Sequence, residues 1–165
     1  MEIEILKTAM EFELNGARFY LETARKVKDV SGKNILIRLA LDELDHHNLL
    51  SLELDEIQNG KKWKKVKVKE SVVEKIKPKL PKRIKEQKGN YVLAEVEALE
   101  VALEQEKKSM DYYKENARKI NDPTAKDLLM RLAQMEEAHY TLIQTEIDNI
   151  RGYGFWMGFQ EFDME

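Results

Sequence analysis

Apolar residues recur at helical spacing in four long stretches of the chain, separated by polar segments. The stretches cover residues 3–27, 33–57, 91–120 and 124–150. Within each one, spacings of three, four and seven residues place the apolar side chains along one face of a helix. The pattern therefore predicts four amphipathic helices and an all-α fold.

Polar residues mark the expected ends of these helices. Ser31 is predicted to be the N-cap of the second helix, and Asn121 or Asp122 the N-cap of the fourth. Pro123 suits the first turn of the fourth helix, where a backbone N–H is not needed. The short turns near Ser31 and Pro123 predict that each helix pair forms an antiparallel hairpin.

The connection between the second and third helices, residues 59–89, is long and strongly basic. Residues 61–88 contain 13 Lys or Arg against 3 Glu, and Pro78 and Pro81 prevent a continuous helix. A connection of about thirty residues is expected where it must run along a bundle about 40 Å long. Its charge leaves two interpretations: a nucleic-acid-binding segment, or a solvated connection resting on the acidic bundle. With Trp63 as its one aromatic residue and no recognition motif, the second is favoured, and nucleic acid is not expected as a partner.

The first helix pair and the second repeat each other. A single offset of 93 positions relates acids, imidazoles, tyrosines and core residues of the two pairs, which indicates an internal duplication of a helical hairpin. The matched positions are Glu13/Glu106, Tyr20/Tyr113, Glu43/Glu136, His46/His139, Ala9/Ala102, Ala24/Ala117, Leu36/Leu129, Leu39/Leu132, Ala40/Ala133 and Leu49/Leu142.

Four acidic residues lie within the apolar stripes of the predicted helices: Glu13, Glu43, Glu106 and Glu136. A lone buried carboxylate would cost on the order of several kcal/mol or take up a proton. No Lys or Arg alternates with these acids on the same face, whereas two divalent cations would balance four carboxylates. The acids therefore predict a metal site inside the bundle.

The histidines strengthen this prediction. Glu43 and His46 form one Glu-x-x-His motif, and Glu136 and His139 form the other, so each motif places an acid and an imidazole on one helix face. His47 has no counterpart at the 93-residue offset and is interpreted as an ordinary residue. Carboxylates and imidazoles without thiolates suit iron or manganese.

The depth of the acids along the bundle follows from their distance to the turns. Glu13 and Glu43 are equally far from position 28, beside "KDVSG", and Glu106 and Glu136 are equally far from position 121, in "NDP". In an antiparallel hairpin, residues equidistant from the turn lie at the same level. Each pair of acids is therefore expected to meet across its hairpin, far from the ends of the bundle.

Composition limits the other possibilities. The 165 residues are predicted to form a single domain, and they contain no cysteine, which excludes disulfides and thiolate metal sites within them. No apolar run is long enough for a membrane span, and the start lacks the features of a signal peptide. A cytoplasmic protein is expected. The aromatic tail, residues 151–165, is expected to fold onto the bundle or onto a second copy, which favours a homodimer.

The stretches "EFELNGARFY", "LALDELDHH", "LEQEKKSMDYY" and "LAQMEEAHY" resemble the rubrerythrin-type members of the ferritin-like di-iron carboxylate family. That family uses a Glu from each of two helices and a Glu-x-x-His motif from each of the other two. The resemblance implies a ferritin-like four-helix bundle with a long crossover between its second and third helices.

The resemblance also assigns roles to the residues. Glu43 and Glu136 would bridge two iron ions, while Glu13 with His46 and Glu106 with His139 would be terminal ligands, the exact partition between the two ions being open. Manganese or zinc could substitute for iron. Candidate catalytic residues are Tyr20 and Tyr113, whose hydroxyls would hydrogen-bond the ligating carboxylates, although a tyrosine on an apolar face can also be plain core.

The chain departs from rubrerythrins in two respects. It has no cysteine, so the resemblance does not extend to a rubredoxin domain, and electrons are expected from an external, rubredoxin-like donor protein. Rubrerythrins also carry an extra Glu one turn after the ligand on the third long helix, where this chain has Ser109. The extra Glu takes part in the peroxide-reducing mechanism of the family, so the resemblance supports that mechanism less strongly than it supports the metal site.

Two functions follow as expectations. The first is an oxidoreductase that reduces hydrogen peroxide or dioxygen at the di-iron site and protects against oxidants. The alternative is a ferroxidase, or an iron-binding or iron-storage protein without peroxidase turnover. A nucleic-acid-binding protein with an inherited metal site is the weakest interpretation of the sequence.

Overall fold

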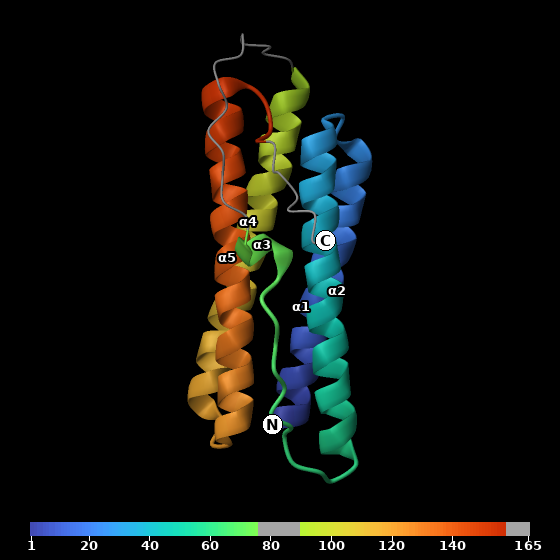
Figure 1. Cartoon of the computed structure of the whole chain (residues 1–165), viewed down its shortest axis with the longest axis vertical. Coiled ribbons are helices and arrows are strands. Elements are labelled where there is room, and N and C mark those ends of the chain that lie inside the picture. The colour runs from blue at the N-terminus through green and yellow to red at the C-terminus, as the bar shows by residue number, and fades with distance from the viewer. Residues whose placement is uncertain (76–89, 158–165) are drawn as a thin grey trace.

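The computed structural model of the chain describes residues 1–75 and 90–157, without the side chains of 90–92. Four long helices dominate it, as the apolar pattern predicts, and a one-turn helix lies in the crossover (Figure 1). The helices are α1 (Glu2–Lys26), α2 (Val30–Gln58), α3 (Val72–Lys75), α4 (Asn90–Lys119) and α5 (Pro123–Tyr153). The all-α, four-helix prediction is confirmed.

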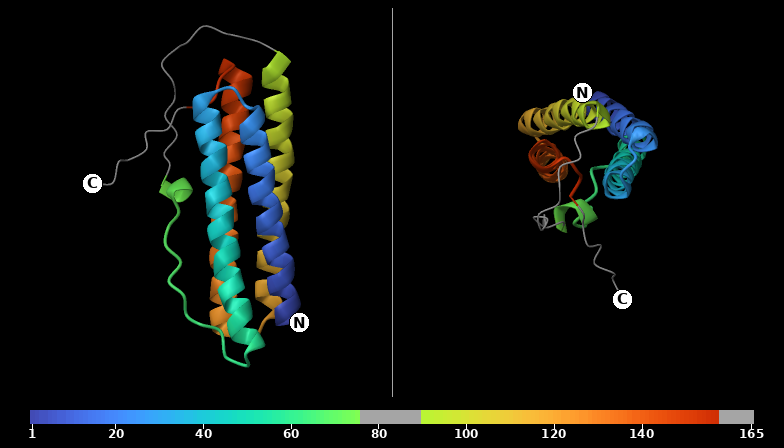
Figure 2. Two further views of the ribbon diagram at one scale, coloured as in Figure 1. Left: turned by 90° about the vertical axis from the view of Figure 1, so that its right-hand side faces the viewer. Right: turned by 90° about the horizontal axis from the view of Figure 1, so that it is seen from above.

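The long helices pack as two antiparallel hairpins. α1 packs along α2, α4 packs along α5, and α1 contacts α4 to join the hairpins. Seen from above, α1 and α4 lie on one side of the bundle, and α3 lies outside α2 and α5 on the other (Figure 2). This is the ferritin-like arrangement, and it places the two Glu-x-x-His helices, α2 and α5, on the side that the crossover covers.

The helix ends lie within about one residue of the predicted ones, except that α2 begins three residues earlier and α5 ends three residues later. The N-cap of α2 is Asp29, whose carboxylate accepts a hydrogen bond from the Gly32 N–H at 2.9 Å. The prediction of Ser31 was wrong, because Ser31 already lies in the first turn of the helix. At α5 the cap is Asp122, which accepts from Thr124 N–H and Ala125 N–H, and Pro123 occupies the first turn as expected.

The first part of the crossover lies against the bundle. Trp63 is buried, and the next residue, Lys64, donates its backbone N–H to Glu53 at 3.2 Å. The Lys64 and Lys61 ammonium groups pair with Glu56 at 2.9 and 3.2 Å. The described half of the basic segment therefore rests on acidic residues of α2, while residues 76–89 lie outside the description.

The short helix α3 is fastened to α5 by an ion pair. Arg131 Nη1 and Nη2 lie 2.5 and 2.7 Å from the two carboxylate oxygens of Glu74. The Ser71 and Glu74 side chains bond each other's backbone N–H groups, which is the capping box of a helix start. The middle of the crossover is thus held against the outer side of α2 and α5.

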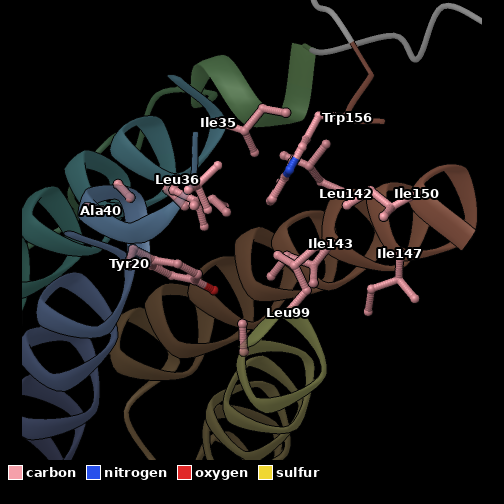
Figure 3. Packing of buried hydrophobic residues seen from close by; sticks show 14 of the residues in the cluster. Tyr20, Ile35, Leu36, Ala40, Leu99, Leu142, Ile143, Ile147, Ile150 and Trp156 are labelled. Carbon is pink, nitrogen blue, oxygen red and sulfur yellow. The ribbon is translucent and has the colours of Figure 1, made fainter. Parts of the chain in front are cut away.

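The beginning of the aromatic tail folds back onto the bundle. The Trp156 indole donates to Glu95 at 2.7 Å, and the Met157 N–H donates to Glu146 at 3.0 Å. Trp156 lies among Ile35, Leu142 and other residues of the core (Figure 3). Residues 151–153 continue α5, residues 154–157 fold back within one chain as expected, and residues 158–165 lie outside the description.

The core consists of two apolar clusters with a polar layer between them. One cluster contains Trp156 and Tyr20, and the other contains Trp63 and Tyr113. The offset of 93 relates the two, since Leu36, Leu39 and Ala40 of the first correspond to Leu129, Leu132 and Ala133 of the second. We call them the Trp156 cluster and the Trp63 cluster.

The duplication extends beyond the helices. Trp63 and Trp156 are 93 positions apart, and so are the buried acids Glu53 and Glu146. Each acid accepts a backbone N–H from the residue that directly follows the tryptophan. Each hairpin therefore ends in the same clasp, in which a buried carboxylate holds the following segment and its tryptophan against the core.

Candidate metal centre

The six predicted ligands meet in the polar layer between the two apolar clusters. Their side chains come from all four long helices, and each residue has at most 3% of its surface exposed. The residues are Glu13 on α1, Glu43 and His46 on α2, Glu106 on α4, and Glu136 and His139 on α5. The structure brings all six together.

The six residues form two overlapping groups of four. In one group, Glu13, Glu43, His46 and Glu136 each place a ligand atom within 4.8 Å of the others. In the other, Glu43, Glu136, Glu106 and His139 do the same. Two carboxylates, Glu43 and Glu136, belong to both groups. The geometry thus favours the partition that the sequence left open, with two shared acids and one acid and one imidazole on each side.

The two imidazoles point the same kind of nitrogen at the carboxylates. His46 Nδ1 lies 3.1 Å from Glu136 and 3.2 Å from Glu13. His139 Nδ1 lies 3.2 Å from Glu43 and 3.5 Å from Glu106. The rings are stacked with their centroids 5.6 Å apart. Each Nδ1 atom is therefore directed at a different group of carboxylates, and the two groups lie next to each other.

Several of these buried atoms lie close together without forming hydrogen bonds. Glu136 Oε1, Glu106 Oε2 and His139 Nδ1 have no hydrogen-bond partner among the described residues. Buried polar atoms are nearly always hydrogen-bonded, so atoms that approach to ion-pair distance without a hydrogen bond leave room for a further partner between them. Carboxylate oxygens and imidazole nitrogens directed at a common point are the donor set of a hard-to-borderline cation. The residues present fit a pair of metal ions.

The two tyrosines hold the unshared carboxylates. The Tyr20 hydroxyl donates to Glu106, and the Tyr113 hydroxyl donates to Glu13, so each tyrosine reaches across from its own hairpin to the other. Both side chains are buried. Burial and the negative charge of the partner carboxylate raise the pKa of each phenol well above 10.0. The hydroxyls therefore stay protonated and act as donors, as the sequence suggested.

The electrostatics of the cluster favour positive charge. Burial lowers the pKa of a histidine, but the carboxylates more than reverse this and raise the pKa of His46 and of His139 well above 6.5. Burial and then the charge of neighbouring carboxylates raise the pKa of Glu43 well above 4.5, and that of Glu106 to about 7. Deprotonated ligands bind metals, so metal binding at such a cluster would release protons.

Sequence reasoning missed Asp42, which precedes the shared Glu43. Its Oδ2 lies 3.2 Å from His139 Nε2, the ring nitrogen that faces away from the carboxylates. A carboxylate behind a ligating imidazole fixes its orientation and its tautomer. The contact joins residues 97 positions apart on α2 and α5, so no local pattern in the sequence could identify it.

A small residue, Gly16, lies beside the shared carboxylate Glu43. The Cβ of an alanine in place of Gly16 would lie 3.5 Å from the Glu43 carboxyl carbon, which is ordinary van der Waals contact. Ser109, the counterpart of Gly16 at the offset of 93, is half-buried. Ser109 stands where rubrerythrins are expected to carry an extra acid, so the cluster has six polar ligand candidates here rather than seven.

Comparisons with known proteins agree with this geometry. The sequence model of the family described as Rubrerythrin matches residues 4–147. A solved structure, described as a hypothetical protein from Pyrococcus furiosus, is similar in fold, with a TM-score of 0.71, 24% identity and 94% of each chain covered. No curated protein matches the chain. Among the described residues, no helix is long and apolar enough to cross a membrane.

Proposed function

Because the chain belongs to the rubrerythrin family, we propose that it is a non-haem di-iron oxidoreductase that reduces hydrogen peroxide or dioxygen. One observation carries the proposal: two overlapping groups of three carboxylates and one imidazole are buried at the centre of the bundle and share Glu43 and Glu136. This arrangement could hold two adjacent cations, each with three carboxylates and one imidazole as ligands.

Iron is the proposed metal. The donor set contains only carboxylates and imidazoles, which suits iron or manganese, and the chain has no thiolate that would favour softer metals. Zinc accepts the same ligands but has no redox chemistry. Zinc could therefore occupy the site without supporting the same reaction.

The reaction needs two electrons and two protons for each peroxide reduced to two waters. When bound, two ferrous ions would supply one electron each. The protein would hold Glu13 and Glu106 in place through the hydroxyls of Tyr113 and Tyr20. The two apolar clusters above and below the polar layer would exclude bulk water from the reacting atoms.

The electrons are proposed to come from an external protein. The 165 residues contain no cysteine and thus no rubredoxin-type iron site that could return electrons to the di-iron site. A homodimer also stays a prediction. Trp156 and Met157 of the tail are buried within one chain, and the mass of the protein in solution tests whether a second copy is bound.

The first test is metal content after anaerobic Fe(II) loading. We expect about two iron ions per wild-type chain and a loss of both in Glu43→Ala/Glu136→Ala, because both shared carboxylates are removed. A matched control is Asp45→Ala/Glu137→Ala, which removes two exposed acids from the same helices. The absence of stoichiometric metal in the wild type would overturn the di-iron proposal.

The second test separates the proposed activity from iron handling. Ferrous protein is mixed with peroxide or with dioxygen, and its oxidation is followed by absorbance. Rapid oxidation by peroxide with two irons retained supports the oxidoreductase. Net oxidation of more than two Fe(II) per chain, with ferric product released, would support the ferroxidase instead. The half-buried Ser109, in place of an extra acid, is the observation that keeps this alternative in view.

A further inference from the structure

The two halves of the metal centre are alike in the residues that face the ions. Each group has the shared Glu43 and Glu136, one carboxylate of its own and one imidazole. Each unshared carboxylate accepts a tyrosine hydroxyl, Glu106 from Tyr20 and Glu13 from Tyr113. The two positions therefore have the same types of ligand, and a difference in the groups behind the ligands can make their metal affinities unequal.

A difference does exist behind the histidines. His139 Nε2 lies 3.2 Å from Asp42 Oδ2, and Asp42 is itself buried with 7% of its surface exposed. His46 Nε2 is also buried, but it has no hydrogen-bond partner among the described residues. One imidazole is therefore backed by a carboxylate, and the other is not.

The duplication explains the origin of this asymmetry. The offset of 93 places Met135 at the position that corresponds to Asp42. Met135 is buried at 4% exposure, and its thioether is only a weak hydrogen-bond acceptor. The two halves thus have the same ligands, but only His139 has a carboxylate, that of Asp42, behind its ring.

We propose that Asp42 is a positioning residue that makes the two metal positions unequal, with the ion at His139 bound more tightly than the ion at His46. The hydrogen bond to Asp42 selects the tautomer that carries its proton on Nε2 and leaves the Nδ1 lone pair directed at the carboxylates. It also makes that nitrogen a stronger donor to a cation. Loss of such an outer partner typically weakens metal binding about 10–100-fold, which sets the expected difference between the two positions.

The consequence rests on the proposed di-metal function. At limiting metal, the protein would hold one ion at the His139 position, and the His46 position would fill last and exchange first. Any entry or release of metal would therefore occur mainly on the His46 side. The inequality concerns binding alone and does not depend on which oxidant the loaded protein reduces.

The test is an anaerobic titration of the metal-free full-length chain with Co(II), which is redox-stable and coloured, in competition with a chelator. For the wild type we expect two ions in two steps whose dissociation constants differ about 10–100-fold. Asp42→Asn should weaken the tight step toward the weak one and leave the weak step unchanged. The unfolding midpoint of the metal-free variant, compared with that of the wild type, checks that the fold is intact.

Single-ligand variants assign the steps to positions. His46→Ala should retain the tight step for one ion, whereas His139→Ala should retain only weak binding. Met135→Gln places an uncharged acceptor at the position that corresponds to Asp42, and it should tighten the weak step if an outer partner is what that side lacks. If Met135→Gln does not fold, the two histidine variants decide the question alone.

The outcomes separate this inference from the proposed function. Two ions that bind with equal affinity, or an Asp42→Asn variant in which both steps weaken equally, would overturn the inequality but leave the di-metal site intact. The absence of Co(II) binding at the six residues would overturn both. Tight binding that survives in His139→Ala and disappears in His46→Ala would reverse the assignment and also overturn the inference.

Discussion

The two helical hairpins of this protein differ at the ends of the bundle more than at its centre. At the centre, α1–α2 and α4–α5 contribute the same acids, imidazoles and tyrosines at an offset of 93. At the ends, the clasps are built from the same parts but are not equivalent. The Trp156 indole donates to Glu95, whereas Trp63 Nε1 has no hydrogen-bond partner in the part of the chain that the structure describes.

The helix starts beneath the two tryptophans differ as well. Trp156 lies against Gly32, where an added Cβ would come within 2.6 Å of the indole ring. At the other end the corresponding residue is Ala125, which is buried in the Trp63 cluster. The tryptophan of the tail thus approaches its helix at a place where a Cβ would block it.

This comparison shows which features a duplicated bundle must keep in pairs. Two adjacent cations of the same kind need the same donors from each hairpin. Because the two groups share Glu43 and Glu136, a change in a shared ligand would affect the binding of both ions. The clasps only need to cover apolar surface, and different packing can do that equally well. The identity of a residue is therefore constrained more strongly at the metal centre than in the clasps.

The largest expected effect comes from removing a tryptophan. Trp156→Ala should lower the free energy of unfolding by about 3–5 kcal/mol, as is typical of deleting a buried aromatic side chain. Trp63→Ala should cost about 1 kcal/mol less, because it breaks no indole hydrogen bond. Urea unfolding of the two metal-free variants measures the difference, and equal losses would show that the clasps are equivalent after all.

The next effect is a pH dependence located at Glu146. Burial raises the pKa of this carboxyl from 4.5 to about 8. In that pH window the folded protein holds a proton that the unfolded chain has lost, so the free energy of unfolding falls as the pH rises through it. Over the roughly three pH units from pH 5 to 8, the change is up to about 4 kcal/mol, at about 1.4 kcal/mol per unit.

Glu146→Gln should remove this dependence, since an amide does not titrate. The measurement is urea unfolding at several pH values between 5 and 8, with Glu53→Gln as the matched variant of the other clasp. Burial also raises the pKa of Glu53, but its nearby lysine opposes this, so its variant should change the slope less. A wild-type stability that does not fall across this range relative to Glu146→Gln would contradict the prediction.

A smaller effect, equal in the two halves, is expected at the tyrosines. Tyr20→Phe and Tyr113→Phe each remove one hydrogen bond to a buried carboxylate. Each variant should lose about 1.5–3 kcal/mol of stability, the usual value for a hydrogen bond to a charged group. The two losses should agree within about 0.5 kcal/mol, because each tyrosine bonds one unshared carboxylate of the centre. A clear inequality would contradict the prediction.

The smallest expected effect tests the contact beneath Trp156. Gly32→Ala should destabilise the protein by about 1–2 kcal/mol, because overpacking against the indole outweighs the gain from replacing a helical glycine. In the Trp156→Ala background the same change should become neutral or stabilising. A double-mutant cycle by urea unfolding measures this coupling, and the absence of coupling would show that the close approach is not what requires a glycine at this position.

Much of this protein follows from the sequence alone. The apolar period located four helices to within three residues at their ends, because a stripe that must be buried repeats with the turn of the helix. The 93-residue offset and the distance of the acids from the turns identified the six residues of the centre and their common level. The same offset also relates Trp63 to Trp156 and Glu53 to Glu146, so the clasps could have been found from the sequence.

The tertiary structure decided how neighbours meet across different helices. The partition of the six residues into two groups, the bond from Tyr20 to Glu106 in the other hairpin, and the contact of Asp42 with His139 all join helices that are distant in sequence. Periodicity fixes which face of a helix is buried, but not which side chain of another helix lies opposite. Local signals also failed at Ser31, because Asp29 lay within reach of the same backbone N–H groups and formed the cap instead.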